Sequence, residues 1–124
     1  MNLPKQAGFD VLVVIVDDCS KDATVAVIEQ YQEKYPFIYL HVNEQNSGVT
    51  VTFEKAISKC TGEFIAISDQ DDIWELNKLE ILVNEIGEHD AVYSNSLLVD
   101  ANGQSLNKSF TSIMNMKTYY SGAP

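Results

Sequence analysis

The sequence predicts an α/β fold in which a mostly parallel sheet carries helices on both faces. Three observations lead to this prediction. Apolar, β-branched runs alternate along the chain with segments of helical periodicity. An alternation of this kind is typical of βαβ units, whose strands pair in parallel. Acidic residues follow the first and third apolar runs, at 17–18 and 69–72, where the strands of such a sheet end.

The first predicted strand and helix span 9–36. Phe9 to Val16, FDVLVVIV, is a nearly continuous apolar run, as expected of a parallel strand that is buried on both faces. Ser20 or Asp22 can then cap a helix, and Pro36 ends it. The apolar face of this helix consists of Thr24, Val27, Ile28, Tyr31 and Tyr35.

The second strand and helix follow at 37–60. FIYLHVN, Phe37 to Asn43, reads as a strand, and EQNSG is a loop of turn-forming residues. A helix that ends near Cys60, with Gly62 at its carboxyl-terminal cap, accounts for the next segment. Its inward positions are Val49, Phe53, Ala56, Ile57 and Cys60.

The remaining elements are predicted with the same criteria. Glu63–Ser68, EFIAIS, is the third strand, and the acidic loop comes directly after it. A helix follows near Leu76–Ile86, with Gly87 at its end. Ala91–Asp100 is the fourth strand, and the Asn102-Gly103 pair favours a hairpin turn. The segment from residue 108 to the end is polar and weakly patterned.

Composition predicts one soluble domain over 1–124, and it excludes some partners. The chain has 124 residues, of which 45% are hydrophobic and 21% are charged. A net charge of −10 argues against nucleic acid as a partner and against docking on anionic lipid. Cys19 and Cys60 are expected to be free thiols. No apolar run reaches 18 residues, and we expect a cytoplasmic chain whose full-length parent could lie at a membrane surface.

The acidic residues predict a site at one edge of the sheet. Two βα units separate 17–18 from 69–72, so both groups should lie at the carboxyl ends of the strands, where such sheets bind ligands. Up to five carboxylates would then surround one crevice, and their repulsion favours a bound cation. Mg²⁺ and Mn²⁺ prefer such oxygen ligands. Asp69 and Asp71 are two positions apart and can reach one cavity.

Two stretches resemble family 2 glycosyltransferases, inverting enzymes of the GT-A fold. VVIVDDCSKDAT resembles the family's strand with Asp-Asp-x-Ser-x-Asp. NSGVTVTFEKAISKCTGEFIAISDQDDIW resembles its Asn-x-Gly loop, helix and Asp-x-Asp segment. SDQDDIW followed by NKLE is most similar to the rhamnosyltransferase-like branch. The resemblance covers about 10–100, and it implies a nucleotide-diphospho-sugar transferase fold and synthesis of a polysaccharide.

The resemblance also implies roles for particular residues. Asp18 would bind the nucleotide base with Asp17 beside it, and Asp69 would lie near the ribose and the metal. Asp71 would coordinate the Mg²⁺ or Mn²⁺ that bridges the diphosphate, which assists departure of the leaving group. The substrate-binding set is Asp17, Asp18, Asn46, Gly48 and Asp69, and the metal set is Asp69 and Asp71.

The chain departs from the family at both ends. Met1 to Gly8 do not match the family's first strand with its Pro-x-Tyr/Phe-Asn motif, and Pro4 stands alone. The chain ends before the half that supplies the acceptor site and the general base. We therefore expect a truncated, partial domain that contains no catalytic residue and is inactive alone. The parent would act on a saccharide or lipid-linked acceptor, and a missing central strand would leave a sheet edge open to self-association.

Two other readings of the residues stay open. A phospho-accepting receiver domain also gathers carboxylates around Mg²⁺, with Asp69 as the acceptor that ends the third strand and Ser94 or Ser96 as the serine that ends the fourth. It would need a lysine after a fifth strand, and Lys117 follows no convincing strand. A fragment that binds without catalysis is the other alternative. Trp74 is expected to pack in a core and not to stack on a sugar.

Overall fold

The computed structural model describes residues 9–115 of the chain. These residues form two compact units, one within 9–73 and the other within 74–115, and each is described by itself. Expectations about 1–8 and 116–124, including those for Pro4 and Lys117, lie outside the described residues. The expectation of a single domain over 1–124 stays a prediction.

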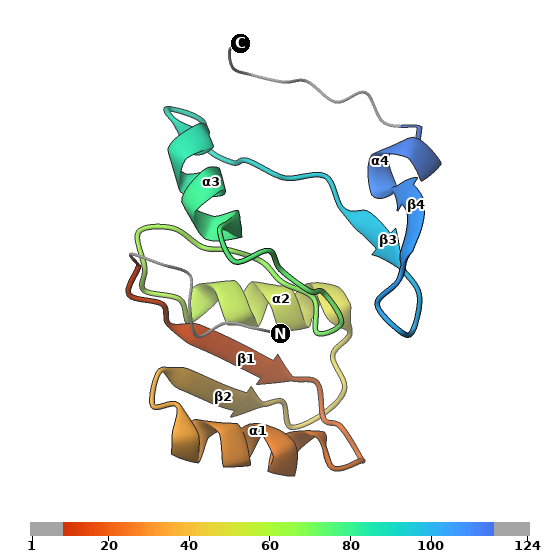
Figure 1. The fold of residues 1–124 in the computed structure, drawn as a ribbon. Helices are drawn as coiled ribbons and strands as arrows, with labels where there is room; N and C mark the ends of the chain where they lie inside the picture. Colours follow the sequence, from red (N-terminus) through yellow and green to blue (C-terminus); the bar gives the residue numbers. More distant parts are fainter. Residues whose placement is uncertain (1–8, 116–124) are drawn as a thin grey trace. The chain divides into compact units, whose positions relative to one another are not determined.

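The first unit is a βαβ arrangement followed by a second helix (Figure 1). Strand β1 (Val13–Asp17) and strand β2 (Ile38–Val42) pair in parallel, with Val13 opposite Ile38 and Asp17 opposite Val42. Helix α1 (Thr24–Lys34) packs against β2, and helix α2 (Val49–Ser58) packs against β1. Figure 1 shows the two helices on opposite sides of the strand pair. The predicted α/β class, with a parallel sheet flanked by helices, is confirmed.

Local sequence explains where these elements begin and end. β1 is VVIVD, a run of β-branched residues that suits a pleated, half-buried surface. The Asp22 carboxylate accepts hydrogen bonds from the Thr24 backbone N–H (2.9 Å) and hydroxyl (2.6 Å), which satisfies a donor at the start of α1. Helix α1 ends before Tyr35, which is extended because Pro36 disfavours the helical conformation in the preceding residue.

The prediction of a third strand at 63–68 is wrong. Residues 63–68 form no strand, and among the described residues no backbone hydrogen bond joins them to β1. Phe64, Ile65 and Ile67 are exposed. An extended run becomes a strand only when a neighbouring backbone pairs with it, and apolar composition alone cannot show whether that neighbour is present.

The second unit contains a helix and a hairpin. Helix α3 (Lys78–Ile86) ends at Gly87, as predicted, with φ of 51°. Strand β3 (Leu97–Val99) pairs antiparallel with strand β4 (Ser105–Ser109) across the predicted Asn102-Gly103 turn, and helix α4 (Phe110–Ile113) follows. The fourth predicted strand is therefore shorter than expected, and it belongs to a separate antiparallel pair. The hairpin turn brings 105–109 alongside 97–99. The backbone of 97–99 therefore pairs with this neighbouring strand and not with the parallel strands β1 and β2.

Candidate functional site

The carboxyl ends of β1 and β2 meet in the first unit, and polar side chains are enclosed there. Asp17 ends β1 with 5% of its surface exposed, and Asn43 follows β2 with 3% exposed. The Asn43 backbone N–H donates to the Asp17 carbonyl oxygen at 2.8 Å, which continues the ladder past β2. Buried polar groups are costly unless they are hydrogen-bonded, so Asp17 and Asn43 are expected to have specific hydrogen-bond partners.

The Asp17 carboxylate is engaged by its own loop. The Ser20 backbone N–H donates to Asp17 Oδ2 at 2.9 Å, and the Ser20 hydroxyl donates to Oδ1. A short acidic side chain here organises the backbone three residues further along the chain. Asp17 thereby sets the path of the chain as it leaves β1.

The Asp18 carboxylate ties a second loop to the end of β1. Its Oδ1 accepts hydrogen bonds from Asn43 Nδ2 and from the Ser47 backbone N–H, both at 2.8 Å. Its Oδ2 accepts one from the Gly48 backbone N–H at 2.8 Å. The Asn43 amide, then the Ser47 N–H, lower the pKa of Asp18 below its ordinary value, because these donors favour the charged form.

The same contacts bring four of the predicted site residues together. Asp17 and Asp18 are consecutive at the end of β1, and Gly48 donates to Asp18 as described. The Asn46 side-chain amide donates to the Asp18 carbonyl oxygen at 3.4 Å. Gly48 has φ of 82° and ψ of 164°, a conformation that favours glycine. The juxtaposition is observed, and the binding of a ligand by these residues stays a prediction.

Sequence reasoning missed three residues that support the cluster. Asn43 has contacts on both sides of its amide, because Lys55 Nζ donates to its Oδ1 at 2.7 Å and its Nδ2 lies 3.3 Å from Thr52 Oγ1. Thr52 and Lys55 are three positions apart on α2, a spacing that places them on one helix face. The signal available in the sequence was Asn43, a polar residue at the end of the predicted second strand, next to the strand that ends at Asp17 and Asp18.

The acidic loop is placed differently from the prediction. Asp69, Asp71 and Asp72 are exposed, and within 9–115 no hydrogen bond reaches their carboxylates. In this part of the chain, no group of three or more His, Cys, Asp or Glu side chains is arranged to hold a metal ion. The structure therefore does not gather five carboxylates around one crevice.

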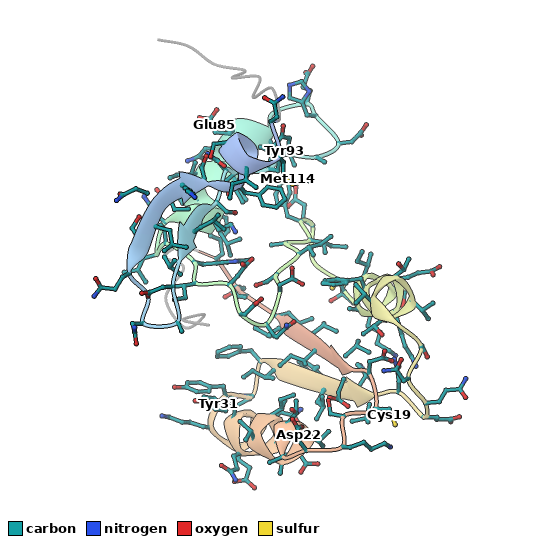
Figure 2. All side chains as sticks on the ribbon, turned by 90° about the vertical axis from the view of Figure 1, so that its right-hand side faces the viewer. Cys19, Asp22, Tyr31, Glu85, Tyr93 and Met114 are labelled. Carbon is teal, nitrogen blue, oxygen red and sulfur yellow. The ribbon has the colours of Figure 1, made fainter. Side chains whose placement is uncertain are left out.

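Trp74 and the two cysteines are the other side chains for which the sequence led to an expectation. Trp74 is 5% exposed, and the Lys78 ammonium lies 4.2 Å from the centre of its ring, so packing is confirmed for this residue. Both cysteines are free thiols, as predicted. Figure 2 labels Cys19 in the loop after β1 and Asp22 where α1 begins. None of the helices within 9–115 combines the length and the apolar character needed to cross a bilayer.

Comparison with known proteins gives a consistent result. The profile of Glycosyl transferase family 2 matches residues 3–121. TuaG of Bacillus subtilis (strain 168), whose name assigns it provisionally to glycosyl transfer in teichuronic acid biosynthesis, is 35% identical over 82 residues. That alignment covers 66% of this chain and 32% of TuaG.

Further relatives carry similar names. The uncharacterized glycosyltransferase alr2836 of Nostoc sp. (strain PCC 7120) is 32% identical over 108 residues, which are 86% of this chain and 34% of that protein. The poly(ribitol-phosphate) beta-N-acetylglucosaminyltransferase TarS of Staphylococcus aureus (strain Mu50) is 31% identical over 91 residues, 73% of this chain and 15% of TarS.

The length of these alignments shows how much of a relative the chain represents. The chain spans about a third of the first two curated relatives, 32% and 34% of their lengths. No solved structure matches the chain. Because the family profile matches 3–121, nearly all of the sequence, the chain belongs to glycosyl transferase family 2.

Proposed function

We propose that this chain is the nucleotide-sugar-binding part of a protein that transfers a sugar from a nucleotide diphosphate to a saccharide or lipid-linked acceptor, with inversion. The observation that carries the proposal is the family match over 3–121. The ordered cluster at the ends of β1 and β2 supports it, because ligands bind at this edge of parallel sheets. Transfer is proposed for the complete protein, and binding without transfer for this chain alone.

The proposed substrate residues are Asp17, Asp18, Asn46, Gly48 and Asp69. Asp17 and Asp18 shape the edge through their hydrogen bonds to Ser20, Ser47 and Gly48. Asn46 is exposed, so the oxygen of its side-chain amide is accessible to a base or ribose.

A divalent cation fits the acidic loop as a partner of the substrate. Asp69 and Asp71 are exposed, and their carboxylates have no hydrogen-bond partner within 9–115. Mg²⁺ is commonly held by one or two carboxylates together with substrate phosphates, and Mn²⁺ accepts the same oxygen ligands. The described residues offer no cage of three side chains, so we propose that the ion binds with the diphosphate and not before it. The ion supplies charge neutralisation to the departing diphosphate.

The acceptor belongs to a polysaccharide pathway in this proposal. TuaG is named for teichuronic acid biosynthesis and TarS for a poly(ribitol-phosphate) acceptor. The SDQDDIW motif with NKLE favours a donor of the rhamnosyltransferase-like branch. We place the reaction in the cytoplasm, with the parent protein at the membrane periphery.

The receiver-domain alternative has lost its support. Such a domain needs an acceptor aspartate at the end of a strand, and residues 63–68, directly before Asp69, form none. The family match covers the same residues. A binding fragment without catalysis agrees with what we propose for this chain alone.

Thermal unfolding in the presence of nucleotides tests the proposed function. We expect Mn²⁺ with one nucleoside diphosphate, from a panel of bases, to stabilise the chain by about 2.7 kcal/mol at one hundred times its dissociation constant. Mn²⁺ alone should stabilise it much less, because the ion needs the phosphates. If no nucleotide in the panel raises the melting temperature, this chain does not bind the donor.

Asp71→Asn tests the metal assignment. The substitution should abolish the gain from Mn²⁺ and nucleotide while leaving stability in chelator unchanged or slightly higher, because one exposed negative charge is removed. Asp22→Asn is the matched control, since Asp22 accepts its hydrogen bonds from Thr24 at the start of α1. An equal ligand-dependent gain in Asp71→Asn and wild type would show that Asp71 holds no metal.

A further inference from the structure

Among the polar and charged residues that the structure describes as buried, Asn43 is the least exposed, with 3% of its surface accessible. It follows β2 directly, and its backbone N–H is held by the Asp17 carbonyl oxygen. No binding role follows for it from the sequence motifs, which place their residues on either side of it. An enclosed amide with four potential hydrogen-bonding directions needs a reason to be there.

The partners of Asn43 fix which way its amide points. The Lys55 ammonium can only donate, so at 2.7 Å it must face the amide oxygen. The amide nitrogen then faces the Asp18 carboxylate at 2.8 Å and the Thr52 hydroxyl oxygen at 3.3 Å. Both amide protons are used, and a flipped amide would place Lys55 against a donor and Asp18 against an acceptor. Lys55 therefore orients Asn43 toward Asp18.

Asp18 passes this orientation to the loop before α2. Its two oxygens are shared between the Asn43 amide and the backbone N–H groups of Ser47 and Gly48. The charged groups near this contact are Lys55 from α2 and Asp17 at the end of β1, and Lys21 in the following loop interacts with Cys19 and Asp17. A carboxylate with donors on both oxygens has one preferred position, and the loop at 46–48 takes its position from it.

We infer that Asn43 is a positioning residue of the nucleotide-sugar site: oriented by Lys55, it holds the Asp18 carboxylate where it fastens the 46–48 loop for ligand binding. The inference rests on the proposed function for its consequence on binding. The fastening itself is a property of the chain alone, and it can be measured without any ligand.

The backbone amides of Ser47 and Gly48 show whether the Asp18 carboxylate holds the loop at 46–48. In wild type, the NMR shifts of the Ser47 and Gly48 amides should follow protonation of Asp18, with a midpoint below the ordinary value of 3.8. Asn43→Asp keeps the size of the side chain but places a second carboxylate against Asp18. We expect the midpoint to rise by about one pH unit or more, because the like charge favours protonation and a donor is lost.

Two further variants complete the test. Lys55→Met removes the orienting ammonium and should raise the same midpoint by less than Asn43→Asp does, which gives a reading if Asn43→Asp does not fold. Asp22→Asn removes another carboxylate with a lowered pKa, in the loop before α1, and should leave the Ser47 and Gly48 midpoint unchanged. An unmoved midpoint in folded Asn43→Asp or Lys55→Met would overturn the inference, since it would mean that the Asp18 carboxylate does not depend on the Asn43 side chain or on Lys55.

Ligand affinity forms a separate arm. With Mn²⁺ and the nucleoside diphosphate that stabilises wild type most, Asn43→Asp should bind at least about tenfold more weakly at pH 7.5, and Asp22→Asn should bind as wild type does. Equal affinity in Asn43→Asp would overturn the role of the fastening in binding. If wild type binds no nucleotide, the proposed function of this chain fails, and the titration still decides whether Asn43 positions Asp18.

Discussion

Asp18 contributes to folding only while its carboxyl group is charged. The donors of Asn43, Ser47 and Gly48 are assembled in the folded chain, and they lower the pKa of Asp18 there. A lowered pKa means that the group stabilises the fold fully above the unfolded value, about pH 4. This contribution is lost as the pH falls through the folded-state pKa, because the unfolded chain then binds the proton more readily.

We predict that the free energy of unfolding falls as the pH decreases below about pH 4. Asp22 and Asp100 have pKa values lowered by their own hydrogen bonds, so they add to the same acid loss. Asp18→Asn should lower stability at pH 7 and reduce the slope in acid. Urea unfolding curves from pH 2.5 to 7 measure both effects, and an unchanged slope in Asp18→Asn would contradict the assignment.

At the scale of the element, the start of α2 depends on the backbone conformation of Gly48. Gly48 precedes the helix with φ of 82° and ψ of 164°, and no atom lies within 4 Å of where a β-carbon would be. Space is therefore available, and only the backbone conformation opposes a side chain. This region is occupied almost entirely by glycine.

We predict that Gly48→Ala lowers the free energy of unfolding by about 1–3 kcal/mol. The loss arises because either the strained conformation is kept or the N–H turns away from Asp18. Gly103→Asn is the control, since Gly103 lies in the hairpin turn with φ of 76°, a value that asparagine tolerates better than most residues. A Gly48→Ala chain as stable as wild type would show that the loop relaxes without cost.

In the described part of the chain, residues 13–17 are paired with another strand, whereas residues 63–68 are not. β1 is hydrogen-bonded to β2, whereas the later apolar run has no backbone hydrogen bond to β1 within 9–115. We predict that amide hydrogen exchange at Val13 and Ile15 is slower than at Ile65 and Ile67, by at least about tenfold. Equal protection would mean that 63–68 is paired in solution.

The sequence predicts local elements better than their partners. α1, β2, α2 and α3 could be predicted because caps, periodicity, Pro36 and Gly87 act within a few residues. The run at 63–68 forms no strand, and only 97–99 of the run at 91–100 does, because apolar composition does not specify which backbone pairs with a run. Asp17, Asp18, Asn46 and Gly48 could be placed together from the motifs. Asn43 and Lys55 were found only in the structure, because no motif assigns a role to either and their contact joins two different elements.

On the scale of the whole molecule, β1 has one strand partner within 9–115, and its other edge is unpaired there. Unpaired edges accept further strands. The net charge of −10 opposes the association of two copies, and salt screens this repulsion over distances beyond about 10 Å at 0.1 M. Self-association should therefore be weak in dilute buffer and stronger in salt.

We predict that light scattering detects a dimer or larger species whose fraction rises between low salt and about 0.5 M salt. Val14→Pro should reduce it. Val13 donates its N–H toward β2, at the Phe37 carbonyl oxygen, so the N–H of the next residue faces the free edge. A monomer at every salt concentration would exclude association through this edge.

Cys19 offers a place to attach a fluorescent reporter. The chain has two cysteines, and Cys60→Ser would leave Cys19 as its only thiol while a hydroxyl replaces the Cys60 donor to the Ala56 carbonyl oxygen. The Cys19 thiol lies within hydrogen-bonding reach of the Glu44 carbonyl oxygen at 3.8 Å, so it bridges the loops after β1 and β2. A dye at this position would sense the loop directly after Asp18, and it would report in real time on the nucleotide binding that we propose.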